Sequence, residues 1–493
     1  MLQGTSSDVG KSFIATAFCA LFRELGYKVA PFKSQNMSNN SYVTMDGKEI
    51  GRAQGIQAEA AGVRANVWMN PILLKPRNDR CAEVVLFGKS FETYEGREYR
   101  EKFYEIGKKA IKTALQKLKE DYDLIVIEGA GSPVEINLND RELVNMKVAE
   151  MADVPVILVA DIERGGVFAS IVGTLELLSK EERKRVKGIL INKFRGDITL
   201  FENGIKWIEE KTGVKVLGVI PYFHEHMIDS EDSLSIRSRF KQGEERELDI
   251  AVIRLPYISN YTDVEPFLFE EDVSIRFVDH PSQFGKPDAL IIPGTKSTIS
   301  DLRWLKEKKL DQVVQQYVNS GGTVVGICGG YQMMSETLID EAGSDTGHKG
   351  YEITGLQLLP SITTFLPNKK TVRSHGFLHP KTGFSNPYVE GYEIHLGTTK
   401  THFNDFVSPF ILTDVGIDGA SLDNGRVIGT YFHHIFENDI FRSEWLNRLR
   451  EKKGLCIKDV VEVKKEKAND YKRIALHVKK HIDFDYLIKL IET

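Results

Sequence analysis

The sequence is poor in cysteine and has no long apolar run. Only four cysteines occur among 493 residues, at positions 19, 81, 328 and 456. They lie far apart and none forms a C-x-x-C pair, which argues against a disulfide framework or a structural zinc site. We therefore expect a cytoplasmic protein. No apolar segment approaches the ~18 residues that a membrane-spanning helix needs, so we expect no membrane partner.

Charge of one sign is not in large excess either. Lysine and arginine number 65 against 70 aspartate and glutamate, which gives a net charge of −5 at pH 7. This balance offers no electrostatic reason to expect nucleic acid as a partner. Hydrophobic residues make up 41% of the chain, an ordinary share for a globular protein, and the length predicts several domains.

The apolar pattern predicts an α/β fold. Short runs rich in β-branched residues alternate with stretches of helical character, as in parallel sheets covered by helices. The expected strands are 124–127, 156–160, 188–192, 216–220, 249–255, 273–278, 289–292 and 323–327. The polar segment 229–247 predicts a linker. We expect two doubly wound parallel-sheet domains, 1–235 and 249–440, and a helical C-terminal appendage over 441–493.

A glycine-rich phosphate loop is the first candidate site. Residues 4–12 read GTSSDVGKS and end in the Gly-Lys-Ser of a P-loop, with one residue more than the usual spacing. Backbone N–H groups and the following helix would bind phosphate, with Lys11 reaching the β- and γ-phosphates and Ser12 offering a hydroxyl to Mg²⁺. The predicted nucleotide-binding residues here are Gly4, Thr5, Ser7, Asp8, Val9, Gly10, Lys11 and Ser12. A chance Gly-Lys-Ser loop is the alternative.

Carboxylates follow two expected strands of the first domain. Glu128 and Asp161 come directly after strands, where side chains that bind Mg²⁺ or contact phosphate would lie. Capping of the next helix is the alternative for each. We predict Glu128 as a metal ligand and Asp161 as a substrate or phosphate contact. Asp46, as a further metal ligand, and Asp140, as a catalytic residue, are weaker candidates.

Two other polar residues stand at expected strand ends. Asn192 ends the run 188–192, where its amide would read a base edge, with a simple turn as the alternative. Lys33 follows a short strand-like run and is flanked by polar residues. Because lysine at such a loop commonly holds a carboxylate or phosphate, we predict that Lys33 contacts substrate or phosphate.

A second candidate site surrounds Cys328. The segment 326–330 reads GICGG, lies between an expected strand and a helix-like stretch, and has the G-x-Cys-x-G form of a nucleophile elbow. Small neighbours suit the strained backbone of a nucleophile. The helix N-terminus should lower the pKa of the thiol. We predict that Cys328 is a nucleophile, whereas a buried structural cysteine is the alternative and the interpretation of the other three.

A thiol nucleophile needs a base and an oxyanion hole. His433, at the end of a short apolar run about 100 residues downstream, is the expected base, and His434 is its main competitor. Backbone N–H groups of Gly294 and Gly329, which both follow strands, are the expected oxyanion donors.

Taken in order, these motifs resemble those of the cobyric acid synthase family. The segments that carry the resemblance start at residues 4 (GTSSDVGKS), 31 (PFKSQNMSNN), 51 (GRAQ), 128 (EGAGSP), 160 (ADIERGGVF), 326 (GICGGYQMM), 391 (GYEIH) and 429 (GTYFH). The resemblance covers nearly the whole chain. The first domain is similar to dethiobiotin synthetase and the second to class I glutamine amidotransferases.

The resemblance implies a glutamine-hydrolysing ligase that depends on ATP and Mg²⁺. Its substrate would be a corrin, adenosylcobyrinic acid a,c-diamide, amidated at the b, d, e and g carboxylates in cobalamin biosynthesis. It also implies that Glu128 binds Mg²⁺ and that Asn192 reads adenine. Asp140 matches an acidic position near the synthetase centre, and Cys328 and His433 match the glutaminase nucleophile and base.

One departure from the class I pattern concerns the histidine. Many class I amidotransferases carry glutamate two residues after it, whereas this sequence has Ile435, so we expect a Cys–His dyad whose orienting group is unnamed. A cobyrinic acid a,c-diamide synthase is the nearest alternative. A nucleotide switch is a second one, disfavoured because Thr5 replaces the signature lysine of partition ATPases. The order of amidation, the oligomeric state, any ammonia tunnel and the corrin-binding residues stay open.

Overall fold

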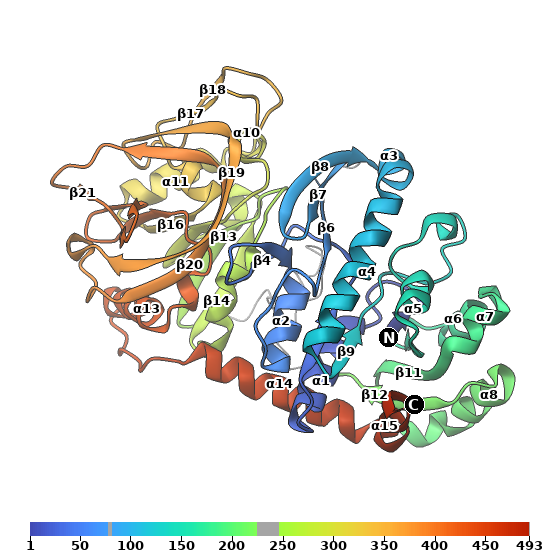
Figure 1. Cartoon of the computed structure of the whole chain (residues 1–493). Helices are drawn as coiled ribbons and strands as arrows, with labels where there is room; N and C mark the ends of the chain where they lie inside the picture. The colour runs from blue at the N-terminus through green and yellow to red at the C-terminus, as the bar shows by residue number, and fades with distance from the viewer. Residues whose placement is uncertain (77–80, 224–245, 493) are drawn as a thin grey trace. The chain divides into compact units, whose positions relative to one another are not determined.

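A computed structural model of the chain describes residues 1–76, 81–223 and 246–492 (Figure 1). The chain forms two compact units. Met1–Glu231 and Lys465–Thr493 form the first, and Asp232–Lys464 forms the second. Most of the predicted linker over 229–247 lies outside the described residues.

A parallel sheet forms the centre of the first unit. Four of its strands pair in the order β1 (Leu2–Gly4), β10 (Val156–Asp161), β11 (Val186–Phe194) and β12 (Val216–Pro221). Two more, β2 (Val29–Phe32) and β9 (Leu124–Ile127), pair with each other. A parallel bridge between Leu2 and Glu128 joins the two sets. Because every pairing is parallel, the carboxyl ends of these strands meet at one edge.

Helices bury both faces of this sheet, which explains its continuous apolar strands. Ile157 and Val159 of β10 lie in one core cluster, while the alternate residues Leu158 and Ala160 lie in another. The helices of the unit are α1 (Lys11–Glu24), α2 (Arg52–Ala61), α3 (Gly96–Glu98), α4 (Tyr104–Asp121), α5 (Met146–Ala152), α6 (Val167–Leu177), α7 (Lys180–Arg185) and α8 (Glu202–Thr212).

The end of the chain also belongs to this core. It forms α14 (Val463–Lys480), within which the boundary between the units falls, and α15 (Phe484–Glu492). Ile474 and Val478 of α14 and Leu487 of α15 are buried in the same cluster as α1. Residues 465–493 are therefore part of the first unit by their packing.

Short strands that the sequence pattern did not predict complete the first unit. A sheet runs in the order β3 (Gln35–Met37), β6 (Ile72–Pro76), β7 (Cys81–Leu86) and β8 (Lys89–Glu95). A hairpin joins β4 (Ser41–Val43) to β5 (Glu49–Gly51). β8 is almost wholly exposed and polar, so no apolar alternation reveals it.

The second unit contains a seven-stranded sheet. Its spatial order is β14 (Val273–Val278), β13 (Leu248–Ile253), β15 (Ala289–Ile292), β16 (Thr323–Ile327), β25 (Val427–Thr430), β24 (Ala420–Leu422) and β21 (Val407–Ser408). The first five strands pair in parallel, whereas β24 is antiparallel to both of its neighbours, β25 and β21. The α-helices among the described residues of this unit are α10 (Thr298–Glu307), α11 (Leu310–Asn319), α12 (Gly329–Met333) and α13 (Asp439–Lys452).

A second sheet in this unit was not predicted. Its order is β18 (Tyr351–Thr354), β17 (Thr337–Asp340), β19 (Ser361–Leu378), β22 (Ile411–Thr413) and β23 (Gly416–Asp418), and β20 (Tyr388–Thr401) pairs with β19. The predicted α/β architecture of two parallel-sheet domains is nevertheless confirmed. No helix in the described part of the chain is long and apolar enough to cross a membrane.

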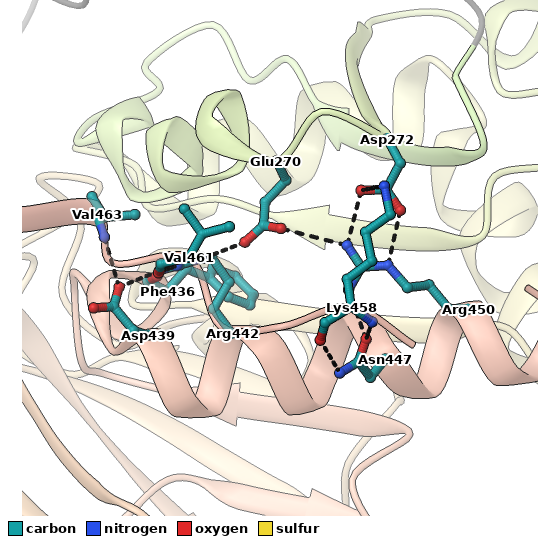
Figure 2. A network of polar contacts seen from close by, with 10 residues as sticks. All are labelled: Glu270, Asp272, Phe436, Asp439, Arg442, Asn447, Arg450, Lys458, Val461 and Val463. Atoms are coloured by element: carbon teal, nitrogen blue, oxygen red, sulfur yellow. Dashed lines mark hydrogen bonds and ion pairs between the residues drawn. The ribbon is translucent and has the colours of Figure 1, made fainter. Parts of the chain in front are cut away.

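Two buried arginines anchor α13 in the second unit. Figure 2 shows Arg442 and Arg450 pointing from the helix toward Glu270 and Asp272, which precede β14. Arg442 Nε donates to Glu270 at 3.0 Å, and Arg450 donates twice to Asp272, at 2.8 and 2.9 Å. Arg442 also donates to the carbonyl of Val461. Since buried charges are stable only when paired, these contacts fix α13 and the chain that enters α14.

Candidate active sites

The phosphate loop joins β1 to α1 and requires glycine at both ends. A Cβ atom on Gly4 would lie 2.7 Å from the side chain of Val9 and 2.8 Å from Lys11 Nζ. Gly10 has a φ of 94°, in the left-handed region, and a Cβ there would fall 2.1 Å from Asn192 Nδ2. The glycines of the motif therefore allow the loop to fold tightly over the end of β1.

Lys11 bridges this loop and the loop after β9. Its side chain is nearly buried, and Nζ donates to the carbonyl of Ser6 at 3.1 Å and that of Gly131 at 3.2 Å. The tip of the loop, residues 6–8, is exposed. The ammonium therefore lies beside an accessible loop at the N-terminus of α1, an arrangement that favours phosphate.

Glu128 is the centre of a buried polar cluster. It accepts hydrogen bonds from Ser12 Oγ at 2.8 Å, Lys33 Nζ at 3.0 Å and Gln57 Nε2 at 2.6 Å. Burial tends to raise the pKa of Glu128, but the Lys33 ammonium and the other donors hold it below its ordinary value. An ionised carboxylate beside a hydroxyl is the type of oxygen donor set that Mg²⁺ takes. Ser12 and Glu128 thus fit the metal predicted for them.

Two residues predicted to contact nucleotide or substrate, Asp161 and Asn192, lie on β10 and β11. Asn192 Nδ2 donates to the carbonyl of Val9 at 2.9 Å. Asp161 accepts from Lys193 Nζ at 2.9 Å and from the backbone N–H of Glu163 at 2.7 Å. The bond to Glu163 lies in the turn after β10 and is not the helix cap given as the alternative for Asp161, because α6 begins only at Val167, with Gly166 as its N-cap. Reading of adenine by Asn192 and contact of Asp161 with substrate stay predictions.

The side chains of Asp46 and Asp140 contact residues outside the polar cluster around Glu128. Asp46 is exposed in the turn between β4 and β5 and accepts from Thr44 Oγ1 at 2.5 Å. Asp140 is exposed on a 3-10 turn and pairs with Arg100. Over the described residues, no three histidine, cysteine, aspartate or glutamate side chains are grouped to hold a metal ion. The metal role of Asp46 and the catalytic role of Asp140 stay predictions.

Cys328 occupies a strained elbow between β16 and α12. Its φ and ψ are 52° and −109°, a conformation that costs a non-glycine residue free energy and is often retained at active sites. A Cβ on Gly330 would lie 1.9 Å from the carbonyl oxygen of Ile292, and one on Gly326 would lie 2.2 Å from Met334 Sδ. The neighbouring glycines thus permit the turn, as the motif predicts.

His433 is the histidine that the structure pairs with Cys328. The N–H at Nδ1 of its buried ring donates to Asp263 Oδ2 at 2.7 Å. Burial alone lowers the pKa of His433, but the Asp263 carboxylate and Cys328 outweigh it and raise this pKa to about 10. The competitor His434 instead makes a T-shaped contact with Tyr392, with ring centroids 4.7 Å apart. An imidazole beside the thiol is the arrangement that a cysteine nucleophile and its base require.

The two expected oxyanion donors flank this pair. A Cβ on Gly294 would lie 2.8 Å from His433 Cε1 and 3.7 Å from Cys328 Cβ, so the backbone of Gly294 runs beside both side chains. A Cβ on Gly329 would lie 2.7 Å from Thr295 Cγ2. The loops of Gly294 and Gly329 therefore adjoin at the nucleophile, and their donation to an oxyanion stays a prediction.

Sequence reasoning missed three polar residues at these sites. They are Gln57, Asn260 and Asp263. Gln57 lies 71 residues from Glu128, and Asp263 lies 170 residues from His433. In the sequence, the only sign that another group orients the imidazole of His433 is the absence of glutamate at position 435.

A phosphate loop in one α/β unit and a Cys–His pair on a nucleophile elbow in the other define a glutamine-hydrolysing amidoligase, which binds a nucleotide and takes nitrogen from glutamine. Residues 1–235 match the family described as the CobQ/CobB/MinD/ParA nucleotide binding domain. Residues 249–441 match the CobB/CobQ-like glutamine amidotransferase domain.

Curated relatives agree over the full length. The cobyric acid synthase of Geobacillus sp. (strain WCH70) is 52% identical over 98% of this chain and 95% of its own, and that of Anoxybacillus flavithermus is 50% identical over 100% and 96%. A solved glutamine amidotransferase, 15% identical, covers 42% of this chain and 99% of its own with a TM-score of 0.31. The chain belongs to the cobyric acid synthase family.

Proposed function

We propose that this enzyme amidates the b, d, e and g carboxylates of adenosylcobyrinic acid a,c-diamide with ATP, Mg²⁺ and glutamine, giving adenosylcobyric acid. Family membership supports the amidation chemistry and the corrin substrate. The observation that carries the proposal is the pairing of Cys328 with His433 in a chain that also carries a phosphate loop. Four free cysteines fit a cytoplasmic location.

We assign activation of the carboxylate to residues 1–235. A substrate carboxylate attacks the γ-phosphorus of ATP, which forms an acyl phosphate and releases ADP. Lys11 and the loop around it would bind the phosphates, and Lys33 would balance charge at the carboxylate or phosphate. Ser12 and Glu128 would hold Mg²⁺, which neutralises charge on the phosphate oxygens. Ammonia then attacks the acyl carbon, and inorganic phosphate leaves as the amide forms.

We assign release of ammonia to residues 249–440. The Cys328 thiolate attacks the side-chain amide carbon of glutamine, and Gly294 and Gly329 stabilise the oxyanion. His433 gives its proton to the leaving nitrogen, so ammonia departs and a thioester stays on Cys328. His433 then takes a proton from water as the water attacks the thioester, which releases glutamate and restores the thiolate.

Product mass tests the substrate assignment. The full chain is incubated with ATP, Mg²⁺ and glutamine, together with either adenosylcobyrinic acid a,c-diamide or cobyrinic acid. The expected result is conversion of the a,c-diamide into a product with four more amides. Amidation of cobyrinic acid at two positions, with the a,c-diamide left unchanged, would show a cobyrinic acid a,c-diamide synthase instead.

A further inference from the structure

Many class I amidotransferases carry a glutamate two residues after the histidine of the glutaminase site, and in this chain that position is apolar. Ile435 stands two residues after His433 and is fully buried in the core of the second unit. A carboxylate reaches the imidazole from another part of the chain. It belongs to Asp263, in the 3-10 helix η5 (Tyr261–Phe269), 170 residues before His433.

We propose that Asp263 is the positioning residue of the glutaminase site, where it holds the His433 imidazole in the tautomer and orientation that proton exchange with Cys328 requires. The inference rests on the proposed glutaminase function of these two residues. Asp263 takes the place of the missing glutamate through a different element of the fold.

The hydrogen bonds of Asp263 determine which ring nitrogen keeps its proton. A carboxylate can only accept, so the 2.7 Å contact with Oδ2 requires a proton on Nδ1 of His433. Nε2 is then the nitrogen that exchanges a proton with Cys328. The other oxygen, Oδ1, accepts the backbone N–H of His434 at 2.8 Å. One carboxylate therefore accepts hydrogen bonds both from the His433 ring and from the backbone of the next residue, His434.

The remaining neighbours of the ring do not select a nitrogen. The amide nitrogen of Asn260 lies 3.3 Å from Nε2 and 3.5 Å from Nδ1, nearly equidistant. Tyr392 of β20 stacks on the ring with centroids 5.1 Å apart. Cys328 faces it from the start of α12. Among these groups, Asp263 provides the carboxylate bond that distinguishes Nδ1 from Nε2.

Burial strengthens this bond. The side chains of Asp263 and His433 are each 1% exposed, and little solvent screens a charge pair at such a depth. Burial lowers the pKa of His433, but the net rise of this pKa agrees with stabilisation of the imidazolium by Asp263 and Cys328 together. Removing the carboxylate should therefore lower the pKa of His433.

Asp263→Asn replaces the acceptor with an amide that can donate to Nδ1 and so favour the wrong tautomer. We expect kcat for glutamine hydrolysis to fall by roughly 10²-fold or more, with little change in KM. The basic limb of the pH profile should move to lower pH, because His433 loses its proton more easily. Asp263→Glu should recover part of kcat. Amidation with ammonium should stay near wild type.

A second measurement does not depend on turnover. Iodoacetamide alkylation of Cys328 in the full chain, followed across pH by mass spectrometry of the Cys328 peptide, reports the thiolate directly. The alkylation profile marks the upper pH limit at which the Cys328 thiolate and the His433 imidazolium coexist. This limit should move to lower pH in Asp263→Asn. Asp272→Asn is the matched control, because Asp272 is also a buried carboxylate of the second unit but pairs with Arg450 instead of His433. This variant should have a lower melting temperature and an unchanged pH profile of alkylation.

The outcomes separate the inference from the function on which it rests. A wild-type chain that releases no glutamate from glutamine contradicts the proposed function. If the wild-type chain does release glutamate, and Asp263→Asn keeps the wild-type kcat and the wild-type pH profile of alkylation, the positioning role is overturned. In a further outcome, Asp263→Asn loses kcat while its melting temperature falls as far as that of Asp272→Asn and its pH profile of alkylation stays unchanged. That result shows a structural role only, and it also overturns the positioning role.

Discussion

Replacement of Arg442 by methionine should strongly destabilise the second unit. The guanidinium is fully buried and donates to Glu270, Asp439 and the carbonyls of Phe436 and Val461. Methionine fills much of the space but leaves these acceptors without the charge. Breaking a buried ion pair costs about 3–5 kcal/mol. With a urea slope of about 2.5–3 kcal/mol per M, the upper part of the ordinary range as suits a unit of this size, the urea midpoint should fall by roughly 1–2 M.

Unfolding in urea can be followed through Trp445, which is buried on α13 against Phe267 and Phe436. Lys452→Met is the matched control, because Lys452 lies on the same helix but is exposed, and its midpoint should barely move. The double variant Arg442→Met/Glu270→Leu should recover part of the loss, since the carboxylate is removed with its partner. Equal midpoints for Arg442→Met and Lys452→Met would refute the reasoning.

Three further changes test other parts of the molecule. Lys11→Ala should abolish ATP-dependent amidation while glutamate release survives at least in part; loss of both would argue against separate sites. Gly330→Ala places a Cβ 1.9 Å from the oxygen of Ile292, so it should displace the elbow and abolish glutamate release, whereas amidation with ammonium continues. Burial raises the pKa of Asp301 from 3.8 to about 7, although hydrogen bonds oppose it. Its contribution to stability is therefore full below about pH 4 and is lost as pH rises to 7. Asp345 and Asp418, whose pKa values burial raises to about 6 and about 7, contribute over the same range. Asp301→Asn should therefore reduce the fall of the urea midpoint between about pH 4 and 7, and an unchanged fall would contradict the shift.

Much of the fold follows from local apolar pattern. The runs at 124–127, 273–278, 289–292 and 323–327 coincide with β9, β14, β15 and β16. The strands β15 and β16 are buried along their whole length, so burial on both faces imposes a continuous apolar sequence there. β8 is exposed, and the long hairpin of β19 and β20 alternates irregularly between buried and exposed residues. Such strands are specified by their pairing partners, which a local pattern does not reveal.

The same division holds for the sites. The phosphate loop and the elbow are contiguous motifs, and the sequence predicts their backbone geometry because specific glycines permit it. Gln57 and Asp263 act through contacts across 71 and 170 residues, and no motif around either residue indicates which partner it contacts. The chain after residue 440 similarly divides between units, with α13 in one core and α15 in the other.

The central claim is that separate sites activate the carboxylate and release ammonia from glutamine. The most direct measurement compares Cys328→Ala with wild type in amidation of adenosylcobyrinic acid a,c-diamide, once with glutamine and once with ammonium as the nitrogen source. The account predicts that the variant loses glutamine-dependent amidation and keeps ammonium-dependent amidation near the wild-type rate. Loss of both activities in a variant that melts like wild type would contradict it.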